Sequence, residues 1–105
     1  MAYEHIAVTG GTGLLGSHVM RRLHGRAALT AIDIKPPPES NRALGTFLEA
    51  SITDYDAMRA AFMGKDAVVH LAAIPNPREA APGVTFNTNV QGAWTVLQAA
   101  EDAGC

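Results

Sequence analysis

The feature that most constrains this chain is a cluster of glycines directly after a short apolar run. Residues 6–8 are apolar, and an amphipathic segment begins before the glycines end, which predicts a strand, a tight turn and a helix. Glycines at such spacing make the bend, let the backbone approach a pyrophosphate and pack the helix on the strand. The helix N-terminus then offers free N–H groups to the phosphates. The spacing satisfies G-x-G-x-x-G and the looser G-x-x-G-x-x-G through Gly10, Gly11, Gly13 and Gly16.

An acidic residue at the end of the next apolar run strengthens this interpretation. Asp33 follows residues 28–32 and stands about 20 positions after Gly13, where a carboxylate binds the adenosine ribose hydroxyls of a dinucleotide. The alternative is an acid that merely ends a strand. Asp33 would repel the 2′-phosphate of NADP, and the nearest cation is Lys35, so the charge pattern favours NAD.

Three stretches together resemble one known family. Residues 9–16 (TGGTGLLG), 68–73 (VVHLAA) and 87–93 (NTNVQGA) are similar, in the same order, to motifs of the extended short-chain dehydrogenase/reductases, the NAD-dependent epimerase/dehydratase family. The resemblance covers nearly the whole chain, and its motifs are specific for the family but not for a substrate.

The pattern of elements predicts an α/β fold. We expect a Rossmann-like, doubly wound parallel sheet, truncated to about four strands in the order 3-2-1-4, because a full dinucleotide fold has about six. Residues 1–105 would be the N-terminal part of such a domain. The expected strands are 6–8, 28–33, 46–52 and 67–73, with a helix capped by Thr53 or Asp54 and a long helix over 84–103. The helix faces expected to be buried carry Leu15, Val19 and Leu23 in the first helix and Val90, Val96, Leu97 and Ala100 in the last.

The resemblance also implies a set of cofactor-binding residues. Ser51 stands where the family usually has an acid that contacts adenine, so the backbone of Ile52 is the alternative contact. Asn89 would be the family's helix asparagine, which braces the adjoining strand; the alternative is a surface amide. For His70 a packed strand histidine with a hydrogen-bond partner is favoured over a catalytic role. The implied set is Gly10, Gly13, Leu14, Leu15, Gly16, Asp33, Ser51, Ile52, Leu71, Ala72, Ala73 and Asn89.

The bulk composition limits the partners that we expect. The chain has a formal net charge of −2 and no long block of Lys or Arg, which argues against nucleic acid and acidic membranes. It has no apolar run near the length of a membrane span, and its first residues lack the order of a signal peptide. We therefore expect a cytoplasmic location. No metal site is predicted, and the one cysteine, Cys105, permits no internal disulfide.

The family's catalytic pair is missing from this chain. The resemblance implies a Tyr-x-x-x-Lys pair, but the only tyrosines are Tyr3 and Tyr55, whose fourth neighbours are Ala7 and Arg59. We therefore predict no catalytic residue here. Two hypotheses follow. The first is the NAD-binding portion of an epimerase, dehydratase or sugar dehydrogenase, whose intact form transfers a hydride at a sugar-like carbinol, with this chain alone inactive. The second is a non-catalytic dinucleotide-binding or regulatory module.

The truncation has a further expected consequence. The strand at 67–73 would be left without a neighbour on one side, and an apolar strand edge with unpaired backbone groups invites pairing with another chain. We therefore expect a homo-oligomer or a strand-exchanged dimer, formed through this edge or through the last helix.

Overall fold

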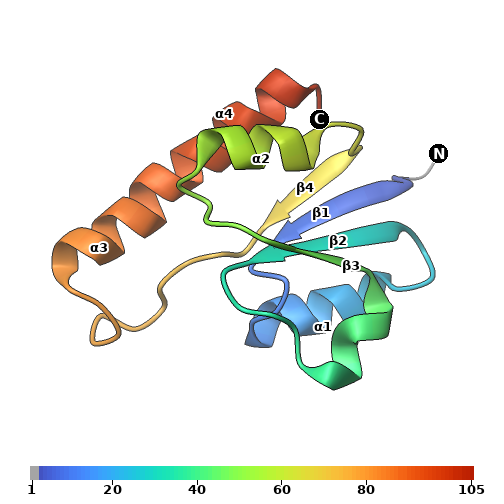
Figure 1. The fold of residues 1–105 in the computed structure, drawn as a ribbon, viewed down its shortest axis with the longest axis horizontal. Helices are drawn as coiled ribbons and strands as arrows, with labels where there is room; N and C mark the ends of the chain where they lie inside the picture. The colour runs from blue at the N-terminus through green and yellow to red at the C-terminus, as the bar shows by residue number, and fades with distance from the viewer. Residues whose placement is uncertain (1–2) are drawn as a thin grey trace.

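The computed structural model describes residues 3–105, and within them a parallel sheet of four strands has the order β3-β2-β1-β4 (Figure 1). This order is the one that the sequence predicts. The elements, in chain order, are β1 (His5–Thr9), α1 (Leu14–Leu23), β2 (Ala28–Asp33), a 3-10 helix η1 (Glu39–Leu44), β3 (Thr46–Glu49), α2 (Tyr55–Phe62), β4 (Ala67–His70), α3 (Pro82–Phe86), a π-helical turn η2 (Asn87–Gln91) and α4 (Gly92–Ala103).

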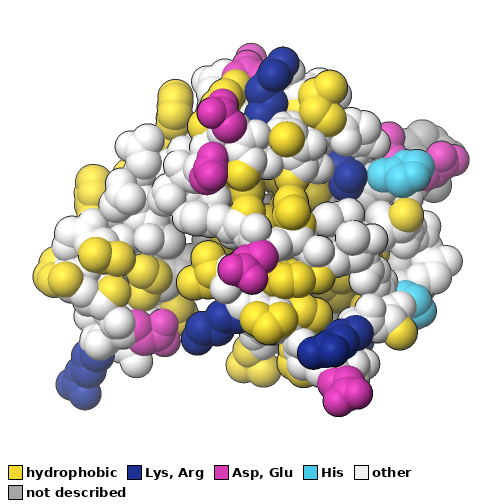
Figure 2. Space-filling model, in the orientation of Figure 1, with side chains coloured by type: hydrophobic (Ala, Val, Ile, Leu, Met, Phe, Trp, Pro, Cys, Tyr) yellow, Lys and Arg dark blue, Asp and Glu magenta, His cyan; other side chains and the backbone are white. Residues whose placement is uncertain are grey.

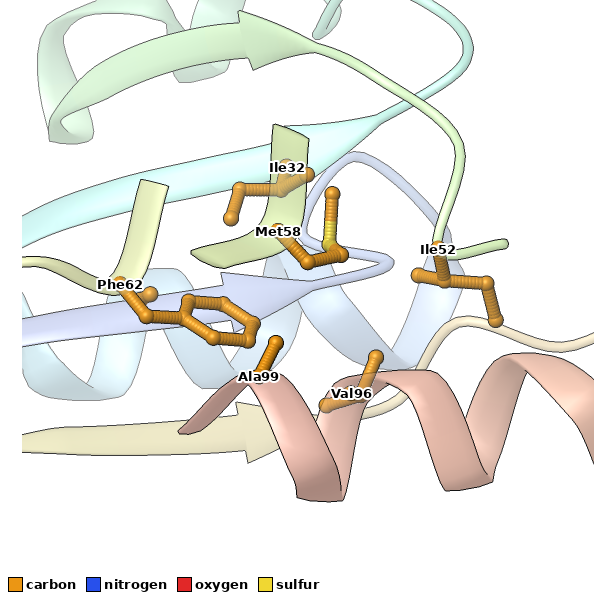
Figure 3. Packing of buried hydrophobic residues seen from close by; sticks show 7 residues of the cluster. Ile32, Ile52, Met58, Phe62, Val96 and Ala99 are labelled. Carbon is orange, nitrogen blue, oxygen red and sulfur yellow. The ribbon is translucent and has the colours of Figure 1, made fainter. Parts of the chain in front are cut away.

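The sheet separates two hydrophobic clusters, because successive side chains of a strand point to opposite faces. On one face Ile6 and Val8 of β1 pack near Met20 of α1. On the other face Ala7 and Ile32 belong to a cluster with side chains from α2 and α4 (Figure 3). The central strands are therefore buried on both sides, as expected for parallel strands. The members of the second cluster are Ala7, Ile32, Ile52, Met58, Phe62, Val96 and Ala99.

The buried face of α1 differs from the expected one. Leu15 is 61% exposed, so its assignment to the sheet face is wrong, whereas Val19 and Leu23 pack at the edge of the first cluster. The residues that α1 buries are Gly16, Ser17 and Met20. Because Gly16 packs directly on the glycine turn, it sets the rotation of the helix and turns Leu15 outward.

The last helical region also departs from the simple expectation. The expected long helix over 84–103 is present as the contiguous run of α3, η2 and α4, with a π-helical turn within it. Val96 is buried, but Val90 and Leu97 are 52% and 69% exposed. Leu97 lines an open groove of about 300 Å³ beside β4, at the sheet edge that has no further strand in the described residues. The prediction that Val90 and Leu97 are buried is therefore wrong for this chain, because nothing here packs over that side.

Two strands are shorter than expected, and the local capping signals are confirmed. β3 ends at Glu49 and β4 at His70, so the residues after them form the loops at the carboxyl edge. The Asp54 carboxylate accepts a hydrogen bond from the Ala57 N–H at 3.1 Å and caps α2. Gly104 ends α4 in the left-handed conformation. In the described part of the chain, no helix has the length and apolar character needed to cross a membrane.

Candidate dinucleotide-binding site

The glycine turn lies at the carboxyl edge of the sheet, directly after the central strand β1 (Figure 1). Gly10 has φ +71°, in the region that favours glycine, and its N–H donates to the Ile32 carbonyl at 2.8 Å. A Cβ built at Gly10 would come within 2.7 Å of the Ala72 nitrogen. The turn therefore packs between the ends of β2 and β4, and Gly10 has no room for a side chain.

The start of α1 combines tight packing inside with open space outside. A Cβ at Gly16 would lie 1.9 Å from the Gly10 carbonyl oxygen, whereas one at Gly13 would meet only that oxygen, at 3.4 Å. Gly13 is the exposed N-cap residue of α1 and no side-chain hydrogen bond caps the helix. The first N–H groups of a helix have no intrahelical partners, so those of Leu14, Leu15 and Gly16 face the open side of the turn.

Asp33 ends β2 beside this turn, and its carboxylate points back to it. Oδ2 accepts a hydrogen bond from the Thr12 N–H at 3.3 Å, and Oδ1 accepts one from the Ile34 N–H at 2.8 Å. The Thr12 hydroxyl donates to the Lys35 carbonyl at 3.1 Å. These contacts join the glycine turn to the end of β2 and place the acid next to the helix N-terminus. Thr12 is not among the expected site residues, because nothing in the motif shows which N–H of the turn meets the acid.

The end of β4 forms the opposite wall of the site. Leu71 and Ala72 follow β4, and their N–H groups donate to the Thr9 hydroxyl at 3.0 and 3.3 Å. Ala73 is exposed. Thr9 is fully buried and was not among the expected site residues, although a polar residue at the end of a buried apolar strand is a signal for such a role.

The Asn89 side chain braces the segment beyond β4. Its Nδ2 donates to the Ile74 carbonyl at 3.0 Å, and its Oδ1 accepts from the Ile74 N–H at 2.7 Å. Both backbone groups of Ile74 are thus held by one amide, as in a strand pair. Of the two interpretations of Asn89, the bracing residue agrees with these contacts and the free surface amide does not. Its position in the π-helical turn η2 is a detail that the sequence pattern did not predict.

The segment after β3 lies beside Asp33, because the Ala50 N–H donates to the Asp33 carbonyl at 3.0 Å. Here the Ser51 hydroxyl is within 2.8 Å of the Thr53 hydroxyl and accepts from the Thr53 N–H at 3.2 Å, so Ser51 makes a local turn. Ile52 is 5% exposed and belongs to the core. The structure thus places all the expected site residues on segments at one edge of the sheet. Their contacts with a ligand stay a prediction.

The ionisable groups of the described residues include one partly buried histidine at this edge. The His70 Nδ1 lies 2.6 Å from the Thr9 hydroxyl, and burial lowers the His70 pKa. His70 is therefore a packed strand histidine with a hydrogen-bond partner, as expected. Away from the site, the Tyr55 hydroxyl donates to Asp102, and this hydrogen bond is the main cause of a raised Tyr55 pKa. Within residues 3–105 no group of three His, Cys, Asp or Glu side chains is arranged for a metal ion.

These features define the class of dinucleotide-binding α/β proteins of the Rossmann type. They are a parallel sheet with helices on both faces, a glycine turn after its central strand and an acid at the end of the next strand. Comparison with known proteins then gives the family. The model of the NAD-dependent epimerase/dehydratase family matches residues 6–105. The chain belongs to that family.

Individual relatives agree with this assignment. The chain is 37% identical over 95 residues to an L-arabinose 1-dehydrogenase (NAD(P)(+)) of Haloferax volcanii, with 90% of this chain and 35% of the relative covered. A solved structure of a UDP-glucose-4-epimerase from Stenotrophomonas maltophila, with bound NAD and formylated UDP-arabinopyranose, superposes with a TM-score of 0.86 at 28% sequence identity. The match covers 97% of this chain and 34% of the epimerase chain. The enzyme WbmG of Bordetella bronchiseptica, in complex with NAD, has a TM-score of 0.82 at 30% identity, covering 98% and 35%. The chain thus spans about a third of the length of these relatives.

Proposed function

We propose that this chain binds NAD across the carboxyl edge of its sheet. The observation that carries the proposal is the Asp33 carboxylate beside an uncapped helix N-terminus, tied to the glycine turn through the Thr12 N–H. The pyrophosphate would rest on the N–H groups of Leu14, Leu15 and Gly16, where the helix dipole favours negative charge.

Asp33 has the capacity to bind ribose as well as the turn. Each carboxylate oxygen accepts one backbone hydrogen bond in the structure, and an ionised carboxylate has about four acceptor positions. The remaining positions would accept the two adenosine ribose hydroxyls. In NADP one hydroxyl is replaced by a dianionic phosphate, which the Asp33 charge would repel, so we propose NAD as the preferred cofactor.

The other predicted residues complete the binding edge in this proposal. Leu71, Ala72 and Ala73 would line the nicotinamide ribose, because ligands of such sheets bind outside the carboxyl ends of the strands. The backbone around Ser51 and Ile52 would border the adenine. Asn89 would act on the nicotinamide side, through the Ile74 backbone that it holds.

Within an intact enzyme of this family, the site would serve hydride transfer between a sugar-like carbinol and the nicotinamide. The named relatives, a sugar dehydrogenase and a UDP-sugar epimerase, support this substrate class. The chain itself lacks a Tyr-x-x-x-Lys pair, and Tyr55 is hydrogen-bonded to Asp102 of α4. We therefore propose that these 105 residues bind the cofactor without turnover. The same absence favours the second candidate, a dinucleotide-binding module without catalysis.

Calorimetric titration of the purified chain with NAD and NADP tests the proposal. The informative variant is Asp33→Asn, which keeps the size of the side chain but removes its charge. We expect it to weaken NAD binding by about tenfold, the effect of losing charge-assisted hydrogen bonds of roughly 1.5 kcal/mol, and to narrow the preference for NAD over NADP. The matched control is Glu49→Gln on the neighbouring strand β3, since Glu49 pairs in register with Asp33.

The two possible failures of this experiment have different meanings. Equal NAD affinity for Asp33→Asn and the parent chain would remove Asp33 from the site. The absence of NAD binding by the parent chain at millimolar cofactor would overturn the proposed function of the chain itself.

A further inference from the structure

A buried hydroxyl joins the ends of β1 and β4 next to the glycine turn. Thr9 and His70 are register partners at the ends of these strands, and the Thr9 hydroxyl lies 2.6 Å from the His70 Nδ1. The same oxygen accepts hydrogen bonds from the N–H groups of Leu71 at 3.0 Å and Ala72 at 3.3 Å. The Leu71 N–H is shared with the Thr9 backbone carbonyl, also at 3.0 Å, whereas the Thr9 hydroxyl is the partner of the Ala72 N–H. Thr9 has no exposed surface, so these protein groups are the partners available to its hydroxyl.

The geometry determines which group carries each proton. A hydroxyl has one proton to donate and two lone pairs that accept. The N–H groups of Leu71 and Ala72 occupy the lone pairs, so the Thr9 proton points to the His70 Nδ1. That nitrogen must therefore be unprotonated, and the neutral ring carries its proton on Nε2. The burial of His70, which lowers its pKa, favours the same neutral form.

The network matters for the glycine turn because the two are in direct contact. A Cβ at Gly10 would lie 2.7 Å from the Ala72 nitrogen and 2.8 Å from the Leu71 carbonyl carbon. The end of β4 is thus packed against the backbone that follows β1. A shift of Leu71 and Ala72 would change the space between the two walls of the binding edge.

We propose that His70 is a positioning residue for the dinucleotide site. By accepting a hydrogen bond from the Thr9 hydroxyl, it orients the oxygen that binds the N–H groups of Leu71 and Ala72 beside the glycine turn. The cofactor part of this inference rests on the proposed function. When His70 is protonated, Nδ1 becomes a donor, and the Thr9 oxygen must accept from it. One lone pair is then withdrawn from these N–H groups. The Leu71 N–H keeps the Thr9 carbonyl, so the Ala72 N–H loses its partner and the segment after β4 loosens.

The surroundings of His70 contain few other groups that titrate. The neighbouring strand β1 contributes Thr9, and α4 contributes Val96, Leu97 and Ala100 along the groove that His70 also lines. Tyr3, Asp66 and Cys105 line the same groove. The Asp66 carboxylate, at the opposite end of β4, accepts from the N–H groups of Glu4 and His5 at 2.8 Å each.

The hydrogen bond is tested without cofactor, by NMR of the imidazole nitrogens and by amide hydrogen exchange between pH 5 and 8. We expect the Nε2–H tautomer of His70 at pH 8 and, as the pH falls through the His70 pKa, a loss of protection at the Ala72 amide. The Leu71 amide keeps the Thr9 carbonyl and serves as an internal reference. His70→Asn supplies a side-chain oxygen near the position of Nδ1 that does not titrate, so protection should remain at low pH. His5→Asn, at the opposite end of β1, is the matched control and should behave as the parent chain does.

The consequence for the cofactor is tested by the same titration at the two pH values. We expect NAD affinity to fall about three- to tenfold from pH 8 to pH 5 in the parent chain, the effect of losing one hydrogen bond. His70→Asn should abolish this dependence. His70→Leu should bind weakly at both pH values, because the hydroxyl loses its acceptor.

Each outcome decides one part of the inference. An Nδ1–H tautomer at pH 8, or unchanged protection of Ala72 on protonation, overturns the proposal. A pH dependence of NAD binding that persists in His70→Asn also overturns it. If the parent chain binds no NAD but the protection follows His70, the proposed function fails and His70 still positions the end of β4.

Discussion

At the scale of single residues, the structure separates glycines that are required from glycines that are tolerated. Gly16 is buried against the Gly10 carbonyl, and the Cβ of any other residue would lie 1.9 Å from that oxygen. Gly83 also lies in a helix, but a Cβ there would meet no atom within 4 Å. The same substitution at the two positions should therefore have opposite effects.

Gly16→Ala should destabilise the chain by about 1–3 kcal/mol, because the turn must open to admit a methyl group. Gly83→Ala, the matched control, should be neutral or stabilise by up to about 1 kcal/mol through better helix propensity. Urea unfolding followed by circular dichroism measures both free energies. A Gly16→Ala chain as stable as its parent would show that the turn does not need this close contact.

At the scale of elements, the π-helical turn η2 sets the orientation of Asn89, whose side chain is hydrogen-bonded to the loop after β4. A π turn inserts one residue into the helical repeat and so rotates the side chains before it relative to those after it. In this chain Asn89 lies within the turn and contacts Ile74, whereas Val96 follows the turn and packs in the core. Close packing adds to this arrangement, because a Cβ at Gly92 would lie 2.5 Å from Ile52 Cδ1.

Asn89→Ala should release the loop that follows β4. It removes one donor and one acceptor from the Ile74 backbone, a loss of about 1–3 kcal/mol when such groups are buried. We expect faster hydrogen exchange at the Ile74 amide and weaker NAD binding. Asn87→Ala, in the same turn but at an exposed position, is the control. Equal exchange at Ile74 in the two variants would contradict the bracing role.

At the scale of the whole molecule, apolar side chains are exposed along one helical side and beside one sheet edge. Figure 2 shows hydrophobic side chains on the surface over α3 and α4, at the left of the view. The spacing of Val90, Trp94 and Leu97 places them on one face, and they are 52%, 57% and 69% exposed. Trp94 is therefore a surface residue and not part of the core.

We propose that this chain associates with a second copy through the edge of β4 or through this helical face. Light scattering at about 10 and 500 μM should show a concentration-dependent dimer. Leu97→Glu should shift the equilibrium to monomer, because a charge cannot be buried without a partner. Leu14→Glu, at a more exposed leucine outside this face, is the control. A monodisperse monomer at the higher concentration would contradict the association.

The sequence by itself determined the features that depend on single residues and their spacing. Gly10 at positive φ, Gly16 at a close contact, Asp33 at a strand end and Asp54 at a helix cap follow from local chemistry, and the apolar strands were enough to predict the order of the sheet. The sequence overestimates the lengths of β3 and β4, because pairing with a neighbouring strand decides where a strand ends.

Only the tertiary structure decided how distant residues share their hydrogen bonds and their burial. Thr9 and His70 are more than 60 positions apart, yet their side chains lie 2.6 Å apart in a network with two further N–H groups. The exposure of Leu15 and Leu97 depends equally on what packs against each helix. Such features could not be predicted from local pattern, because a side chain's periodicity indicates a face but not which neighbours cover it.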